Sequence, residues 1–360
     1  MDQLLPDRAR KGRGAVSNRA SRYDAETRVA VDDGWRSVED DDLPPLRTTV
    51  TPDATRTIIA RNDSPDIGFD RSINPYRGCE HGCVYCFARP THAYLGLSPG
   101  LDFETKLTAK FDGPALLAKE LRAKTYKCAV MAMGTNTDPY QPIEREHRIT
   151  RGILQVLAEH DHPVGIVTKS ALVTRDLDIL APMAAKGLCT VLLSVTTLDG
   201  ELARKLEPRA STPRKRLAAI EALARAGVPA GVMAAPMIPA LNDSEMEAIL
   251  EAARDAGALR ASFTLLRLPL EIKDLFSEWL EAHAPNKARH VLSLIRQSRG
   301  GRLNDPNFHS RFVGTGAYAD LMARRFRLAC RKLGLNQTPL VLDTSKFRLP
   351  PRAGDQLALL

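Results

Sequence analysis

Short apolar segments alternate with longer segments of helical periodicity between about residues 70 and 270, and this alternation constrains the fold more than any other feature. The apolar segments contain few polar residues, which is typical of parallel strands covered by helices. We expect six strands, in RSINPYRG, KCAVMAMG, VGIVTK, LCTVLLSVT, PAGVMAAP and ASFTLLRL. The segments between them predict helices, among them 114–124, 144–160, 176–187, 212–227 and 243–257. Successive strand–helix units predict an α/β fold, a partial (β/α)6 TIM-like barrel.

The segments that flank this core differ from it in composition. Residues 1–60 are rich in Arg and Asp and lack apolar periodicity, so they predict an irregular N-terminal arm, with VEDDDLPPLR as a linker-like stretch. Residues 61–270 form the expected barrel core. Residues 271–360 predict a mainly helical C-terminal extension, in which AYADLMARRFRLACRKLG is a basic amphipathic helix that ends at Gly334.

Composition narrows the function classes. The chain has no run of eighteen apolar residues, so we expect no membrane span, and its N-terminus lacks the apolar core of a signal peptide. We therefore expect a cytoplasmic protein with reduced cysteines, which favours metal binding over disulfides. The net charge of +8 fits an anionic partner such as a nucleic acid, and it fits a basic solvated surface equally well.

The stretch RGCEHGCVYCFARP places Cys79, Cys83 and Cys86 within eight positions. The remaining cysteines stand alone in the sequence: Cys128, Cys189 and Cys330. Three thiolates on one loop can hold three irons of a [4Fe–4S] cluster and leave the fourth iron open for a ligand that is not protein. The cysteine loop therefore predicts an iron–sulfur site with one open position.

A zinc site is the alternative interpretation of the same loop. Structural zinc normally has four protein ligands, and His81 or His92 could complete a Cys3His set. Gly78 and Gly82 flank the first two cysteines and suit a loop that wraps closely around a metal group. This alternative predicts a zinc-stabilised, non-catalytic nucleic-acid-binding protein.

Polar residues follow the predicted strands at their carboxyl ends, where barrels of this type carry their chemistry. These sites are the cysteine loop after the first strand, GTNTD after the second, Lys169 ending the third, Ser194 ending the fourth and PMIPALND after the fifth. We expect all of them to face one site.

The spacing C-x3-C-x2-C, with the aromatic Tyr85 before the last cysteine, resembles the radical S-adenosylmethionine (SAM) superfamily. The resemblance implies that the open iron chelates the amino and carboxylate groups of SAM. It further implies reductive cleavage of SAM to a 5′-deoxyadenosyl radical, which abstracts hydrogen from a substrate. A reductant such as flavodoxin or ferredoxin is the implied partner.

Within that superfamily, residues of about 70–270 resemble the spore photoproduct lyase group, the DNA repair photolyase-like proteins. The likeness rests on NTDPYQPIE, IVTKSALVTRDLDIL, the segment from LLSVTTLDG to ALARAG, and GVMAAPMIP. It implies that Cys79, Cys83 and Cys86 hold the cluster. The implied SAM contacts are Thr137 and Asp138 near the amino group, Lys169 at the carboxylate, Ser194 at a polar group and Pro236 beside the adenine.

The sequence departs from the lyase pattern in its substrate half. Thr135 stands where the lyase has a hydrogen-donating cysteine, and Phe87 stands where it has a tyrosine. Tyr85 and Thr135 are the remaining candidates for a catalytic role. These departures predict an intact radical-generating half and an altered substrate, which is a nucleic acid, a protein or a small metabolite.

Each implied contact also has a plain structural interpretation. Lys169 fits an exposed lysine, Asp138 fits a turn residue before Pro139, and Ser194 fits a hydroxyl satisfied by backbone. Glu207, before Pro208, fits a residue that caps the following basic helix or forms a salt bridge to it.

Overall fold

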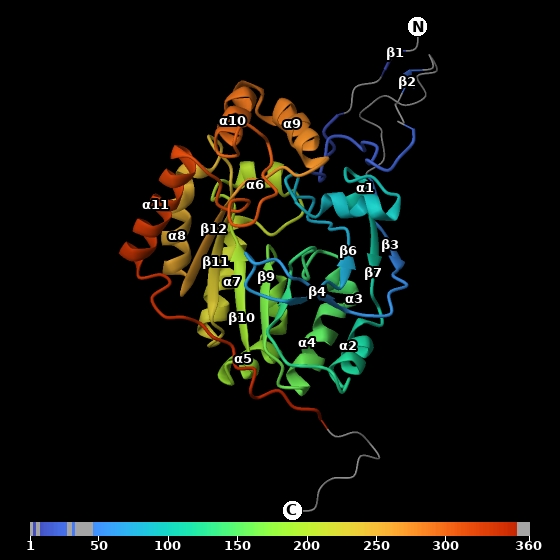
Figure 1. The fold of residues 1–360 in the computed structure, drawn as a ribbon, viewed down its shortest axis with the longest axis vertical. Helices are drawn as coiled ribbons and strands as arrows, with labels where there is room; N and C mark the ends of the chain where they lie inside the picture. The colour runs from blue at the N-terminus through green and yellow to red at the C-terminus, as the bar shows by residue number, and fades with distance from the viewer. Residues whose placement is uncertain (1–2, 5–7, 27–30, 33–45, 351–360) are drawn as a thin grey trace, which may run out of the picture.

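A seven-stranded sheet in the order β12-β11-β10-β9-β8-β5-β4 forms the centre of the molecule (Figure 1). It is seen in a computed structural model, which describes residues 3–4, 8–26, 31–32 and 46–350. The strands are β4 (Ile59–Arg61), β5 (Arg71–Ile73), β8 (Met131–Met133), β9 (Val164–Thr168), β10 (Cys189–Ser194), β11 (Ala230–Met237) and β12 (Arg260–Leu265). Within this sheet β5, β8, β9, β10, β11 and β12 pair in parallel, whereas β4 pairs antiparallel with β5. The α/β class is confirmed, and the sheet is mixed because of this edge strand.

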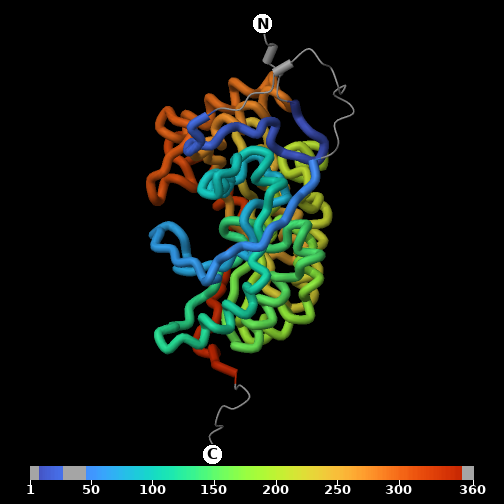
Figure 2. Tube along the Cα trace, turned by 90° about the vertical axis from the view of Figure 1, so that its right-hand side faces the viewer, coloured from blue at the N-terminus to red at the C-terminus, as the bar shows by residue number. Residues whose placement is uncertain are grey.

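Helices connect the parallel strands, and in Figure 2 the green and yellow helical segments gather on one side of the molecule. They are α2 (Gly113–Leu121), α3 (Glu144–His147), α4 (Ile149–Glu159), α5 (Leu177–Ala185), α6 (Gly200–Leu206), α7 (Pro213–Arg225) and α8 (Met246–Asp255). The start of α7 follows local rules, because the Thr212 hydroxyl accepts a hydrogen bond from the Lys215 N–H and Pro213 occupies the first turn. Such local signals explain why the helix positions could be predicted from sequence.

The first predicted strand, RSINPYRG, is divided between two sheets. β5 ends at Ile73, and β6 (Tyr76–Arg77) instead pairs antiparallel with β7 (Lys106–Ala109). β7 pairs in parallel with β3 (Thr49–Pro52), which completes a three-stranded sheet. Pro75 lies between β5 and β6, and because it has no N–H it cannot continue a ladder.

The predicted helix 144–160 is interrupted at Arg148, whose φ is 51°. The Glu144 carboxylate accepts hydrogen bonds from the N–H groups of Thr150 (3.0 Å) and Arg151 (3.3 Å). In a continuous helix these two N–H groups would donate to carbonyl groups of the preceding turn. Here the Glu144 carboxylate takes the place of those carbonyl groups. The break is a consequence of this capping interaction.

Residues 8–26 are one described part of the N-terminal arm. They lie against the upper end of the molecule, beside α1 (Asp102–Thr105) and α9 (Ile272–His283) (Figures 1 and 2). The Ser17 hydroxyl donates to Glu278 on α9 at 2.6 Å. A short antiparallel pair joins β1 (Gln3–Leu4) and β2 (Val31–Asp32). Most of the linker-like stretch VEDDDLPPLR lies outside the described residues.

The C-terminal part contributes α9, α10 (Pro285–Gln297) and α11 (Ala317–Leu333). The basic helix α11 ends as predicted at Gly334, which has the left-handed φ of 71°. Between α10 and α11, residues 298–316 form turns that carry Phe312 to the cavity described below. None of the described helices has the length and apolar character needed to cross a membrane.

His162 predicts an acid-dependent loss of stability. Its ring is fully buried between the Tyr126 hydroxyl (2.6 Å from Nε2) and the Pro163 carbonyl (3.0 Å from Nδ1). Burial lowers the pKa of His162 from 6.5 to about 4. The unfolded chain therefore binds a proton that the folded chain does not, and we expect the free energy of unfolding to fall by about 2–3 kcal/mol between pH 6.5 and pH 4.

Urea denaturation across this pH range measures the effect. His162→Gln should remove most of the pH dependence, whereas the same change at the exposed His290 should leave it in place. Equal slopes for wild type and His162→Gln would contradict the assignment.

Candidate functional site

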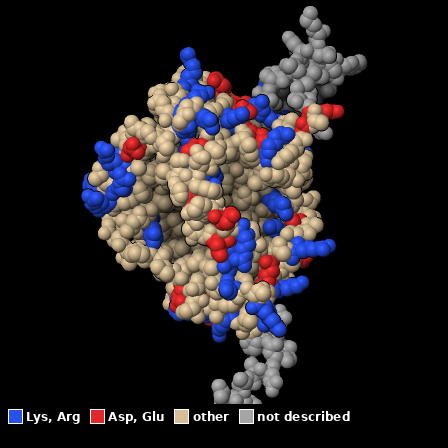
Figure 3. Space-filling model, viewed as in Figure 1, with Lys and Arg blue, Asp and Glu red and all other residues tan. Residues whose placement is uncertain are grey.

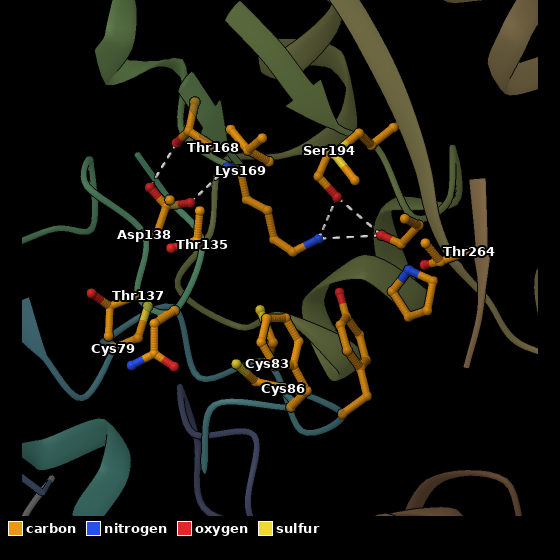
Figure 4. Close-up of a pocket in the computed structure, with 18 of the residues that line it drawn as sticks. Cys79, Cys83, Cys86, Thr135, Thr137, Asp138, Thr168, Lys169, Ser194 and Thr264 are labelled. Carbon is orange, nitrogen blue, oxygen red and sulfur yellow. Dashed lines mark hydrogen bonds between the residues drawn. The ribbon is translucent and has the colours of Figure 1, made fainter. Parts of the chain in front are cut away.

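A cavity of about 340 Å³ opens at the carboxyl ends of the parallel strands. The cluster, SAM and catalytic candidates named from the sequence all line it: Cys79, Cys83, Tyr85, Cys86, Thr135, Thr137, Asp138, Lys169, Ser194 and Pro236. The cysteines lie on one side of the cavity and the Lys169 and Ser194 side chains face them from the other (Figure 4). The tertiary structure thus brings the predicted residues of five chain segments to one place.

The cysteine loop lies between β6 and the 3-10 helix η2 (Arg89–Leu95). Gly78 and Gly82 have φ values of 75° and 68°, which agrees with the expected close-wrapping loop. The loop is anchored by hydrogen bonds from the Cys79 N–H to the Phe103 carbonyl (2.9 Å) and from the Val84 N–H to the Leu206 carbonyl (3.1 Å).

A fully buried ion pair between Arg89 and Glu104 supports the loop from behind, with the nitrogen and oxygen 2.5 Å apart. The Arg89 guanidinium also donates to four carbonyl groups, those of Gly82, Cys83, Pro99 and Gly100. One arginine therefore holds two turns of backbone together. Sequence reasoning missed both residues, because an Arg in CFARP and a Glu in DFET carry no local sign of burial.

The N-terminal arm completes this support. The N–H groups of Gly14 and Ala15 donate to the two Glu104 carboxylate oxygens at 3.0 and 2.8 Å. A Cβ at Gly14 would lie 1.7 Å from the Gly82 carbonyl oxygen, so only glycine allows this approach of the arm to the cysteine loop. The segment GRGAVSN is thus part of the scaffold of the site.

Asp138 lies between the cysteine loop and the end of β9. Its carboxylate accepts hydrogen bonds from the Thr168 hydroxyl (2.7 Å) and the Lys169 N–H (2.7 Å) (Figure 4). It also accepts from the Tyr140 N–H (2.9 Å), and the His81 Nδ1 lies 3.3 Å away. Burial acts to raise its pKa, but His81 and these hydrogen bonds keep the pKa below the ordinary value, so Asp138 is a carboxylate.

Lys169 extends across the cavity to Ser194, and its Nζ lies 2.6 Å from the Ser194 hydroxyl (Figure 4). The same Nζ is 3.1 Å from Glu207, which is fully buried. Glu207 also pairs with Arg216 on α7, as the sequence predicted for the basic helix. Burial opposes ionisation of Glu207, but Arg216 and Lys169 hold its pKa well below the ordinary value. Lys169 and Arg216 together carry two positive charges against the one negative charge of Glu207. The excess positive charge faces the cavity at Lys169.

The two candidates for a catalytic role differ in their surroundings. The Tyr85 hydroxyl is buried and hydrogen-bonds to Glu207 and to Thr196. Burial and the adjacent Glu207 raise the pKa of Tyr85, so it stays a neutral phenol. Thr135 makes only long hydrogen bonds, of 3.4 and 3.5 Å, to the Asn74 side chain, so its hydroxyl is available to the cavity.

Thr137 and Pro236 are each held in place by a hydrogen bond to a neighbouring residue. The Thr137 hydroxyl donates to the Tyr76 carbonyl at 2.9 Å. The buried Asn242 amide donates to the Pro236 carbonyl (3.0 Å) and accepts from the Ile238 N–H (2.6 Å), which holds the PMIPALND loop in shape. Asn242 was not singled out from the sequence, although its buried amide holds the backbone of Pro236, which lines the cavity.

The donor set fits a cluster that the cysteines alone would hold. All three thiols line the cavity, and burial raises the pKa of each thiol, so a bound cation is what would stabilise the thiolates. His92 is turned away, with Nε2 2.9 Å from the Lys106 carbonyl, and His81 is beside Asp138. Among the described residues, no group of three or more His, Cys, Asp and Glu side chains is placed to hold a single metal ion.

Comparison with known proteins agrees with this geometry. The family model of the radical SAM superfamily matches residues 73–253, half of the chain. An uncharacterized protein of Mycobacterium tuberculosis is 38% identical over 231 residues, which cover 64% of this chain and 68% of that protein. An uncharacterized protein of Methanocaldococcus jannaschii is 30% identical over 174 residues, or 48% of this chain and 62% of that protein.

Solved structures share the fold. A spore photoproduct lyase mutant with bound AdoMet and dinucleoside spore photoproduct superposes with a TM-score of 0.55 at 16% identity, covering 79% of this chain and 80% of that chain. Spore photoproduct lyase complexed with dinucleoside spore photoproduct gives a TM-score of 0.52 at 18% identity over the same shares. At these identities the likeness concerns the fold.

Proposed function

The chain belongs to the radical SAM superfamily, and from this premise we propose that Cys79, Cys83 and Cys86 hold a [4Fe–4S] cluster with which it removes a hydrogen atom from a substrate. Members of this superfamily use such a cluster and SAM. The two groups together supply a 5′-deoxyadenosyl radical. The six parallel strands of the central sheet would form a partial (β/α)6 barrel within residues 61–270. Residues 1–60 would be an arm, in which β3 and the start of β4 join the sheets, and residues 271–360 a C-terminal extension.

The observation that supports this proposal best is the position of Lys169 opposite the cysteines across one cavity. Lys169 and Ser194 offer an ammonium and a hydroxyl to the SAM carboxylate, because the nearby negative charge of Glu207 is already shared with Arg216. Thr137 and Asp138 border the cavity beside Cys79 and suit the SAM ammonium group (Figure 4). Pro236 offers an apolar surface to the adenine.

We propose a nucleic acid as the substrate to test first, with flavodoxin or ferredoxin as the reductant. The net charge of +8 supports an anionic partner. The fold neighbour named above was solved with a dinucleoside photoproduct. On the face seen in Figure 3, Lys and Arg side chains are interspersed with Asp and Glu and do not form one continuous basic patch. This pattern favours a local contact at the cavity over a long nucleic-acid groove.

Anaerobic reconstitution of the chain with iron and sulfide tests the proposal. We expect a brown protein with about four iron atoms per chain. After reduction with dithionite it should convert SAM into 5′-deoxyadenosine and methionine, measured by chromatography. A colourless chain that retains one zinc ion and leaves SAM intact would instead support the zinc-stabilised binding protein.

A further inference from the structure

Three phenylalanines and two arginines alternate at the edge of the cavity, and we call them the Arg–Phe ladder. The Arg267 guanidinium lies 5.2 Å from the centre of the Phe87 ring and 5.1 Å from that of Phe312. Arg311 lies 4.8 Å from the Phe312 ring and 5.0 Å from the Phe308 ring. The ladder joins the residue after the last cysteine to the turns between α10 and α11, so only the tertiary structure assembles it.

The two arginines of the ladder differ in their partners. Arg311 forms an ion pair with Asp66, and its Nε lies 2.8 Å from a carboxylate oxygen. Arg267 makes no hydrogen bond or ion pair with any residue in the described part of the chain, although it is half-buried. Burial and the neighbouring Arg311 lower the pKa of Arg267, and the Asp66 carboxylate, which is paired with Arg311, offsets only part of this effect.

Arg267 faces the same cavity as the cysteines. Phe87, Arg267 and Phe312 line this cavity together with Cys79, Cys83, Cys86 and Lys169. The guanidinium lies between the two rings, and such cation–π contacts favour a defined arginine side-chain position, which reduces the entropy lost when it binds. An oriented guanidinium without a protein partner is suited to a planar, two-point contact with an oxyanion.

We propose that Arg267 binds an oxyanion of the substrate, a phosphate or a carboxylate, at the mouth of the cavity. This inference rests on the proposed function, because it assigns the ligand to the substrate side of the same site. Lys169 already has Glu207, Ser194 and the proposed SAM carboxylate as partners, so Arg267 is the remaining Lys or Arg among the described residues that line the cavity. The ladder would then favour charged substrates over neutral analogues of the same shape.

Isothermal titration calorimetry on the reconstituted full-length chain, saturated with SAM so that Lys169 and the open iron are occupied, tests the assignment with three small probes: methyl phosphate, acetate and the neutral acetamide. We expect one binding event with methyl phosphate or acetate and none with acetamide, and the preferred anion identifies the oxyanion source. Arg267→Gln should weaken that binding about 10- to 100-fold, because it removes a charged hydrogen-bond donor. The matched control is Arg302→Gln, at an exposed arginine of the same region, which should bind as the wild type does.

Equal affinity of wild type and Arg267→Gln for the preferred anion, or binding of acetamide as tight as that of the preferred anion, would overturn the proposal. If Arg267→Gln does not fold, Arg267→Lys takes its place in the titration, because lysine keeps the charge but loses the two-point contact. An anion affinity of Arg267→Lys equal to that of the wild type would contradict the assignment. The titration requires neither reduction nor SAM cleavage. Absence of 5′-deoxyadenosine would therefore defeat the proposed function while leaving the anion measurement intact.

Discussion

Serine in place of Cys79, Cys83 or Cys86 is expected to abolish stable cluster binding, and 5′-deoxyadenosine formation should fall below detection. Each thiolate would hold a different iron, and a hydroxyl is a poor ligand for this soft metal group. Of the two histidines considered as ligands, His92 points to the Lys106 carbonyl, and His81 lies 3.3 Å from the Asp138 carboxylate, which it would have to leave to replace the lost sulfur. Iron content, visible absorbance and product chromatography measure the loss.

Cys128→Ser provides the matched control for these variants. Cys128 is a half-buried cysteine outside the residues that line the cavity, so its replacement should leave iron content and SAM cleavage near the wild-type level. If one of the three loop variants kept a full cluster and full activity, that cysteine would not be a ligand. The assignment of an open iron corner would then have to be revised.

Arg89→Met is expected to lower the free energy of unfolding by about 3–5 kcal/mol and to weaken retention of the cluster. The change leaves the Glu104 carboxylate buried without its partner and removes the donors to four carbonyl groups behind the cysteine loop. Urea denaturation measures the stability, and iron content after gel filtration measures cluster retention. Adding Glu104→Gln should restore part of the stability, because no unpaired charge then remains.

The exposed pair of Arg19 and Glu278 is the comparison for this prediction. Their side chains are 45% and 26% exposed, so Arg19→Ala should cost no more than about 1 kcal/mol. If Arg89→Met cost no more than Arg19→Ala, the buried pair would not be the support of the loop. If the double variant Arg89→Met/Glu104→Gln were less stable than Arg89→Met alone, the unpaired Glu104 carboxylate would not explain the loss of stability.

The features that could be predicted from sequence are local ones. The strand–helix order followed from apolar periodicity, the start of α7 followed from Thr212 and Pro213, and the cysteine loop followed from its spacing. The common location of Lys169 and Ser194 also followed, because the carboxyl ends of parallel strands meet at one edge of a sheet. Their roles toward SAM stay predictions until ligand binding is measured.

Local rules failed where a contact between distant residues decided the conformation. The break at Arg148 depends on the Glu144 cap and the position of β6 depends on pairing with β7, and neither has a strong signal in the periodicity.

The sequence by itself thus determined the order of elements and the residues at the cavity, because propensity, capping and spacing act over a few positions. Only the tertiary structure decided what surrounds them: the contact of Gly14 with Glu104, the ion pair of Lys169 with Glu207 and the stacking of Arg267 on Phe87. Each joins segments far apart in the chain. Their energies arise from burial and charge pairing, which exist only after the chain has folded.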